Sequence, residues 1–319
     1  MEGRPAAIGR ALARRGLGFA ATVVIAATAV MALFALAPGD AIDSLPNGPE
    51  VRAALEAEWG LGGGFASRLS AGLTRLATGH LGHSLTYRPG TPVAELVWSG
   101  FAASATLLVP ALLLGAALGY AGAALRRGRG APLVRAASAA SAVPVVLAAL
   151  GVVTGLNAAA WAAMERGWID RPGWFALPEE PGFVRAALAV LVLGLASARL
   201  ASLVDRAGSV LDALLAAPFV DAERARGGPV GRLVARHLVV PTAALLAEQL
   251  PALLSALVVV ERAFSMPGAG SMFWSSCGAR DWPLAAGLVV AAATLVAGAR
   301  LAAETLAIAL DPRAREDEA

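Results

Sequence analysis

The chain has 319 residues, of which 57% are hydrophobic and only 15% are charged, and its formal net charge is +3. This composition carries more apolar surface than a soluble protein of the same length normally buries, so it argues against a soluble globular domain and indicates a membrane protein. All 26 basic residues are arginine. The absence of lysine excludes a P-loop ATPase, because that motif needs a lysine to reach the nucleotide phosphates.

Long apolar runs predict transmembrane helices, because about 20 helical residues, rising about 1.5 Å each, cross the hydrocarbon layer of a bilayer. Three runs carry no charge, and three later ones carry a few charged residues. In chain order the six predicted spans are 16–39, 96–125, 136–164, about 183–204, about 238–260 and about 283–308. We therefore expect an all-α integral membrane protein with about six transmembrane helices.

The first predicted span, residues 16–39, has a secretory signal as its alternative interpretation. Four arginines precede it, and Ala35 to Ala37 imitate a cleavage site. Its uncharged stretch is longer than the apolar region of a signal peptide, which has about 7 to 15 residues. We therefore expect a retained membrane anchor.

The placement of arginine predicts the orientation. With a cytoplasmic N-terminus, 16 arginines fall in cytoplasmic segments, 9 fall in external segments and Arg300 lies inside a span. This bias obeys the positive-inside rule, so the positive charge reflects topology rather than nucleic-acid binding. The predicted layout is a cytoplasmic N-terminus (1–15), the first transmembrane helix (16–39), an extracytoplasmic loop (40–95), a five-helix core (96–310) with a cytoplasmic loop at about 205–237, and a cytoplasmic tail (311–319).

The sequence offers no constellation for catalysis or metal binding. His80 and His83 stand three residues apart without a third ligand near them, and His237 is isolated. A nucleophile elbow of the form Gly-x-Ser-x-Gly is also missing. We therefore expect a protein that is not an enzyme, has no catalytic residues and binds no metal or cofactor itself.

A short, sharply bounded helix is predicted within residues 218–229. A proline suits its first turn, and a Gly-Gly-Pro sequence ends it. Its acidic residues come early and its arginines late, which suits the helix dipole and allows ion pairs of Asp221 with Arg224 and of Glu223 with Arg226. So short a helix is marginal alone in water, so we expect it to dock on a partner; an ordinary charged connector is the alternative.

Polar residues inside the predicted spans need partners, because a charged side chain at mid-membrane costs about 2.5 to 3.5 kcal/mol on insertion scales. Glu248 and Gln249 are expected to face a solute pathway or a partner helix, or Glu248 bonds backbone groups that Pro251 frees. Arg300 and Glu304 lie one turn apart, so we expect them to neutralise each other.

Several motifs carry a resemblance to a known family. The segment Phe219, Val220, Asp221, Ala222, Glu223, Arg224, Ala225, Arg226, Gly227 resembles the coupling loop of ABC transporter permeases of the dipeptide/oligopeptide/nickel family, which typically reads Tyr-Val-x-x-Ala-Arg-Ala-Lys-Gly. Further matching segments follow in the family's order: Pro38 to Asp40, Gly79 to Leu85, Pro92 to Val93, Pro144, Val260 to Gly270, Arg280 to Pro283 and Leu310 to Arg313. The match is collinear over nearly the whole chain, although Glu223, Arg226 and Arg300 depart from the family's usual residues.

The resemblance implies the type I importer-permease fold, with spans two to six as the transport core. It also implies a second permease subunit, either the same or a different chain, cytoplasmic ATPase subunits that bind ATP and Mg²⁺, and an external solute-binding protein. The coupling residues would be Phe219 and Asp221 to Gly227. The external turn would be shaped by Glu261, Phe264, Pro267, Gly268, Gly270, Arg280 and Asp281.

The function that the resemblance implies is import of a peptide-like solute across the inner (plasma) membrane, with nickel or another small solute as the alternative. Two rival functions are a proton-coupled secondary transporter, which would use Glu248 or the Arg300 and Glu304 pair, and a membrane scaffold that does not transport. A secondary transporter usually shows inverted repeats, and none is evident in the sequence.

Overall fold

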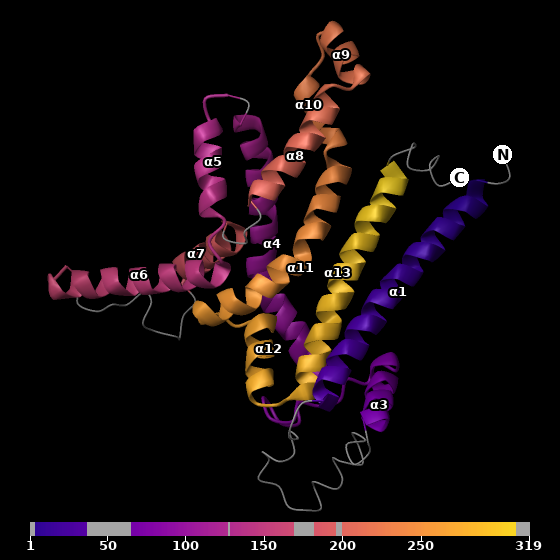
Figure 1. Cartoon of the computed structure of the whole chain (residues 1–319), viewed down its shortest axis with the longest axis vertical. Coiled ribbons are helices and arrows are strands. Elements are labelled where there is room, and N and C mark those ends of the chain that lie inside the picture. Colours follow the sequence, from indigo (N-terminus) through magenta and orange to yellow (C-terminus); the bar gives the residue numbers. More distant parts are fainter. Residues whose placement is uncertain (1–3, 37–64, 127, 169–181, 196–199, 311–319) are drawn as a thin grey trace, which may run out of the picture. The chain divides into compact units, whose positions relative to one another are not determined.

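A computed structural model of the chain describes residues 4–36, 65–126, 128–168, 182–195 and 200–310 (Figure 1). This part is built of helices joined by turns, with one isolated bridge between His83 and Pro92. The helices are α1 (Arg4–Leu36), α3 (Phe65–Ala77), α4 (Val93–Leu125), α5 (Ala131–Ala140), α6 (Val145–Glu165), α7 (Phe183–Leu195), α8 (Leu200–Leu215), α9 (Pro218–Ala225), α10 (Val230–His237), α11 (Val239–Ala263), α12 (Ala269–Gly278) and α13 (Trp282–Leu310).

Five of the described helices are long and apolar enough to cross a membrane: α1, α4, α6, α11 and α13. The consecutive helices α7 and α8 pass the same test together, as one span broken by a bend of 67°. This agrees with the prediction of about six transmembrane helices. Both α4 and α11 continue through an internal proline, Pro110 and Pro251, as membrane helices tolerate.

Two predicted spans are not single helices. The uncharged run 136–164 divides into α5 and α6, because Pro144 stands at the N-cap of α6. Proline lacks an amide hydrogen and its ring disfavours a preceding helical turn, and here residues 141–144 separate the two helices instead of continuing the first. The predicted span 183–204 also separates into α7 and α8, which differ in direction by 67°.

The predicted loops contain more helix than the sequence suggested. The segment 205–237 holds the last part of α8 and all of α9 and α10. The segment 40–95 holds α3, which packs against α1, while residues 37–64 lie outside the described part. Residues 1–3 and 311–319, which belong to the two predicted cytoplasmic ends, also lie outside it.

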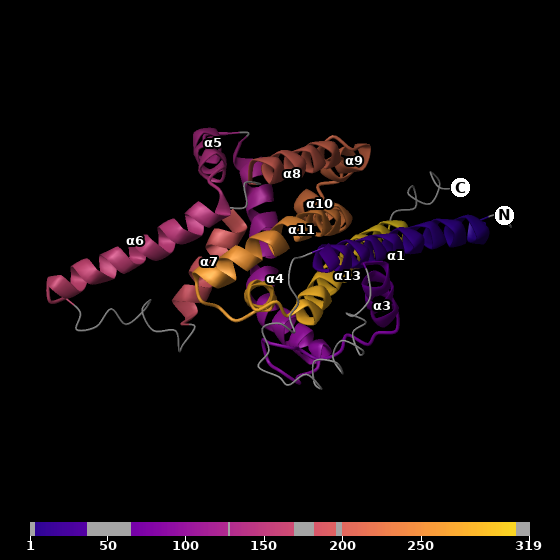
Figure 2. The ribbon, with the colours of Figure 1, turned by 60° about the horizontal axis from the view of Figure 1, so that its bottom comes forward.

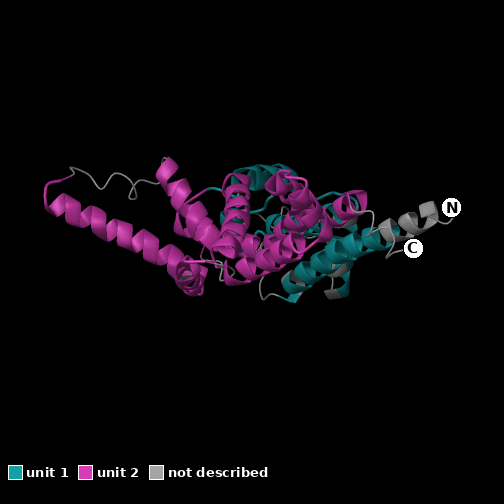
Figure 3. Ribbon diagram, turned by 90° about the horizontal axis from the view of Figure 1, so that it is seen from above, with its two compact units in different colours: residues 1–103, 267–302, 312–319 teal, residues 104–266, 303–311 magenta. Residues whose placement is uncertain are grey.

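The chain forms two compact units (Figure 3). The first consists of Met1–Ala103, Pro267–Ala302 and Pro312–Ala319, and the second of Ser104–Met266 and Ala303–Asp311. In the first unit α1 lies beside α13, as Figures 1 and 2 show, and a buried cluster joins the start of α4 to α12 and α13. In the second, α11 packs against α6 and α7, and α10 packs against α8, α9 and α11.

Candidate functional site

The helix expected at 218–229 is present as α9, at the end of α8 (Figure 1). Pro218 occupies its first position, and after its last turn Gly227 adopts a φ of +72°, which favours glycine. The Glu223 carboxylate lies against Gly228, where a Cβ would overlap it. The positive φ of Gly227 therefore lets the chain turn from α9 into α10, and Gly228 leaves room for the Glu223 carboxylate.

One face of α9 packs against the rest of the protein and the other face is exposed. Val220 is fully buried, and the Phe219 ring stacks on His237 of α10 with centroids 4.6 Å apart and planes inclined by 23°. Asp221 and Arg224 form the expected ion pair, at 2.9 Å. The spacing also allows a pair of Glu223 with Arg226, but among the described residues of α9 the ion pair that forms is the one between Asp221 and Arg224. The exposed residues of this segment are Asp221, Ala222, Arg224, Ala225, Arg226 and Gly227.

Close packing fixes α8 against α4. A Cβ on Gly119 of α4 would stand 3.3 Å from the Leu203 carbonyl oxygen, and one on Gly122 would stand 2.6 Å from a Val204 methyl carbon. Small residues at a helix crossing allow the two backbones to approach, which is a common way for membrane helices to associate. The glycines of α4 thus allow α8 to pack closely against α4. In this position α8 runs in a direction that differs from that of α7.

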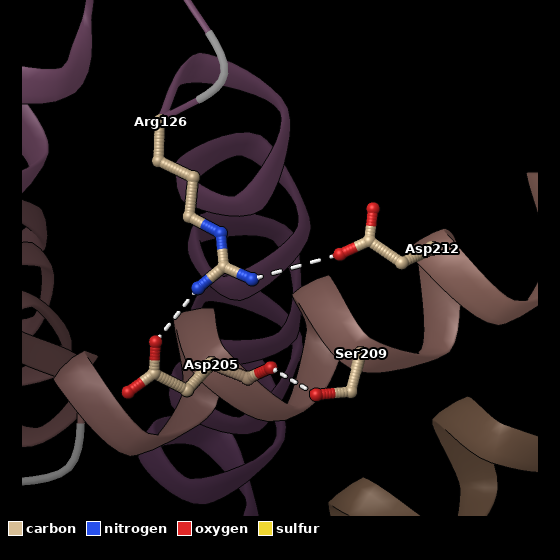
Figure 4. Close-up of polar contacts among 4 residues, drawn as sticks. All are labelled: Arg126, Asp205, Ser209 and Asp212. Carbon is tan, nitrogen blue, oxygen red and sulfur yellow. Dashed lines mark hydrogen bonds and ion pairs between the residues drawn. The ribbon is translucent and has the colours of Figure 1, made fainter.

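An arginine at the end of α4 reinforces this contact (Figure 4). The Nη1 atom of Arg126 donates to Oδ1 of Asp205 on α8 at 2.7 Å, and its Nη2 lies 3.9 Å from Oδ2 of Asp212. A Cβ on Gly208 would overlap this guanidinium. Arg126 therefore lies across α8 at the one position without a side chain.

Arg206, which directly follows Asp205 on α8, contacts a different helix. Arg206 forms an ion pair with Glu248 of α11, and Tyr120 of α4 shares a hydrogen bond of 3.0 Å with Thr242 of α11. Neighbouring residues of α8 thus tie it to α4 and to α11. Both alternatives for Glu248 missed Arg206 as its partner, because the two residues are far apart in the sequence and no local spacing links them.

Gln249, the neighbour of Glu248, is buried between α11 and α4. Its Oε1 faces Gly115, where a Cβ would stand 3.0 Å away, and its Nε2 is buried with no hydrogen-bond partner among the described residues. Arg300 and Glu304 lie on α13 with exposed side chains. The mutual neutralisation of Arg300 and Glu304, like a pathway role for Glu248 and Gln249, stays a prediction.

The residues expected at the external turn include two fully buried carboxylates. Glu261, in the last turn of α11, accepts a hydrogen bond of 2.5 Å from Ser104 of α4. Phe264 is also buried, close after the end of α11. In the second unit, therefore, the end of α11 is fastened to α4.

Asp281, in the first unit, organises the turn between α3 and α4. It accepts hydrogen bonds from the Ser84 hydroxyl at 2.5 Å and from the amides of Thr86 and Tyr87, both at 3.0 Å. Its other oxygen accepts from the Leu284 amide in the first turn of α13, at 3.3 Å. Of the neighbouring predicted residues, Gly268 and Gly270 are buried, Pro267 is exposed, and Arg280 is exposed with a φ of +56°.

The same turn borders an open cavity of about 550 Å³, lined by Arg75, His80 and His83 among others. Within the described part of the chain, no group of three or more His, Cys, Asp or Glu side chains could hold a metal ion. Among the described residues that line the cavity, Arg75 is basic and none is acidic.

The sequence of the chain is similar to those of several known proteins. No model of a protein family matches the chain. The oligopeptide transport system permease protein OppB of Salmonella typhimurium is 26% identical over 319 residues, covering 95% of this chain and 98% of that protein. The glutathione transport system permease protein GsiC of Salmonella choleraesuis is 28% identical over 283 residues, covering 85% and 87%. AppB, an oligopeptide permease of Bacillus subtilis, is 30% identical over 123 residues, covering 37% and 39%.

These relatives are permease proteins of transport systems, and two of them align with this chain over most of both lengths. The several apolar helices agree with such a multi-pass membrane protein. The order of the motifs, the helical fold and the full-length similarity agree: over most of its length the chain is similar to permease proteins of oligopeptide and glutathione transport systems.

Proposed function

We propose that the chain is the membrane-spanning permease subunit of an ATP-driven importer, and that α9 is the helix on which a cytoplasmic ATPase subunit acts. The observation that carries this proposal is the way α9 is connected, through α8, to the transmembrane helices. It is a separate eight-residue helix with one exposed face, and it follows directly on α8. Two ion pairs in turn bind α8 to the transmembrane helices α4 and α11.

The geometry supports a relay of motion. A partner that grips the exposed face of α9 moves Phe219 and Val220 with it, and their contacts engage α10 and the body of the second unit. The packing and ion pairs of α8 then pass the displacement to α4 and α11. A transporter that alternates between two states needs such a connection, because the energy source acts outside the membrane and the pathway lies within it.

The solute, partners and orientation are proposed from the relatives. The similar proteins are named as permeases of oligopeptide and glutathione transport systems. We therefore propose a peptide-like solute for this chain. We propose a second permease subunit, ATPase subunits holding ATP and Mg²⁺, and a solute-binding protein on the outer side as partners. The protein would lie in the inner (plasma) membrane, with α9 and both termini on the cytoplasmic side.

The test is reconstitution with a paired substitution. Gly227→Val strains the backbone, because Gly227 has a φ of +72°, and should abolish ATP hydrolysis stimulated by solute and binding protein. Gly231→Val is the matched control, since neither position has any atom within 4 Å of an added Cβ and Gly231 has no positive φ. The control should keep most of the stimulation.

Other outcomes distinguish the rival functions. Uptake driven by a proton gradient without any ATPase would identify a secondary transporter, and a chain that binds the partners but moves no solute would be a scaffold. Normal stimulation in the Gly227→Val protein would overturn the role of α9. Membrane insertion of both variants, measured by fractionation, separates loss of coupling from loss of folding.

A further inference from the structure

The membrane helix α11 exposes a different kind of surface from α1, α4 and α6. Those three expose several large apolar side chains each, as expected of helices that contact lipid. On α6 they are Val146, Leu147, Leu150 and Trp161. On α11, every residue of which is described, the large apolar side chain that is exposed to this degree is Val239, the first residue of the helix. The other exposed residues of α11 are Ala244, Glu248, Ser255 and Arg262. The exposed surface of α11 is therefore small and polar.

These four residues, the polar stripe of α11, lie on one face of the helix. They are spaced by four, seven and seven residues, and a helix with 3.6 residues per turn brings such positions into line. Glu248 stands three residues before Pro251, the middle residue of this 25-residue helix. A charged side chain at this depth of a membrane span faces protein or a water-filled cavity, because lipid does not solvate it. The stripe is therefore the part of α11 best suited to line a solute pathway.

Glu248 is the acidic residue of the stripe, and a ligand can reach it. Its carboxylate pairs with Arg206 of α8, yet 53% of its side chain is exposed. A carboxylate offers about four acceptor positions, so it can bind a second cation beside the guanidinium. The Ser255 hydroxyl donates to the Pro251 carbonyl oxygen at 2.9 Å, and its own oxygen remains an acceptor. Around Glu248 the stripe thus presents acceptors, and the donor that fits a carboxylate best is a cationic amine.

We propose that Glu248 binds the protonated amino terminus of the peptide-like solute as it passes along α11. This inference rests on the proposed function, which supplies the solute and the pathway. Arg206 holds the carboxylate in place and already neutralises part of its charge. Ion pairs in contact with water are weak, so the amine is held only loosely. A transport site needs this weakness, because the solute must leave it again.

Acetylation of the peptide tests the contact at the level of one chemical group. The thermal midpoint of the full chain in detergent is measured against rising concentrations of trialanine and of N-acetyl-trialanine, because a ligand that binds the folded state raises this midpoint. For the wild-type chain, trialanine should act at a concentration roughly tenfold lower than the acetylated peptide, the effect of one charge-assisted hydrogen bond. Glu248→Gln should abolish this difference, because an amide has no charge to attract the amine.

Arg206→Gln is the matched variant, since it breaks the same ion pair and keeps the carboxylate. It should retain the preference for trialanine. Glu165→Gln, at the exposed end of α6, should behave as the wild-type chain does. If Arg206→Gln and Glu248→Gln lose the preference equally, the pair merely links α8 to α11 and the binding site is overturned. A wild-type chain that does not distinguish the two peptides overturns it as well.

The measurement needs no ATPase, so its result is separate from that of the proposed function. A preference for trialanine that depends on Glu248, without ATP-driven uptake by the reconstituted complex, would support the binding site and overturn the importer. ATP-driven uptake by a chain that lacks the preference would overturn the binding site alone.

Discussion

Single carboxylates determine much of the local architecture. Asp281 is fully buried, and it accepts hydrogen bonds from the turn between α3 and α4 and from the first turn of α13. A buried carboxylate is tolerated only where donors replace the water that it loses, and here they do. Two segments distant in the sequence are therefore held together by one side chain.

Asp281→Ala should destabilise the protein strongly. The change leaves the buried hydroxyl of Ser84 and the amides of Thr86 and Tyr87 without their acceptor, and each unsatisfied group costs about 1 to 3 kcal/mol. We expect the thermal midpoint in detergent to fall clearly. The control Glu95→Ala removes an exposed carboxylate from α4 and should change it little. Equal midpoints for both variants would contradict the role of Asp281.

The thiol of Cys277, on the short helix α12, gives a pH-dependent signal. Desolvation raises its pKa above the ordinary thiol value, so less reactive thiolate is present at neutral pH than in a freely solvated cysteine. Alkylation by a maleimide should therefore be slower than at a cysteine introduced at the exposed Ala222 of α9. The rate at Cys277 should also keep rising at pH values where the reference thiol has levelled off. Identical pH profiles would show that the thiol is fully solvated.

At the scale of elements, the contact between α4 and α8 depends on glycine. The small residues Gly119 and Gly122 let the backbones approach, and Gly208 makes room for Arg126. The same helix then continues into α9. In the proposed function, the tightness of this contact would let displacement of the short helix α9 reach a transmembrane span.

Gly122→Leu should separate α8 from α4, because the added side chain would meet Val204. We expect transport and solute-stimulated ATP hydrolysis to be lost and the midpoint of thermal unfolding to fall. Gly151→Leu on α6 is the matched control, since Gly151 has nothing within 4 Å of an added Cβ. A Gly122→Leu protein that transports as well as this control would show that the contact can loosen without consequence.

At the scale of the whole molecule, the helices account for a multi-pass membrane protein, and the proposed function requires α9 and α12 to face opposite sides of the membrane. Labelling of single cysteines tests this orientation. A membrane-impermeant maleimide should modify Cys277 in intact spheroplasts, whereas a cysteine at Ala222 in a Cys277→Ser background should react only after permeabilisation. Reaction of Ala222→Cys from outside would reverse the orientation and remove the basis for ATPase docking.

Local features of the sequence were sufficient for the spans and for α9. Uncharged runs identified most of the membrane helices, because the length and apolarity of one segment decide whether it can cross a bilayer. The bounds of α9 also followed from local residues, since proline and glycine act on the backbone where they stand. The same local logic was insufficient at 136–164, where apolarity suggested one helix although Pro144 divides it.

Only the tertiary structure determined the partners of the polar residues. Glu248 was recognised as a group in need of a partner, but Arg206 lies on another helix, and nothing in either local sequence connects them. Arg126, placed by the sequence merely among the arginines of a cytoplasmic segment, lies across α8 between two acids because the glycines of α4 and α8 bring these helices together. Hydrophobicity and backbone preferences are properties of a segment, and the sequence by itself determines them. The pairing of charges depends on where helices cross, and that is settled only when the whole chain packs.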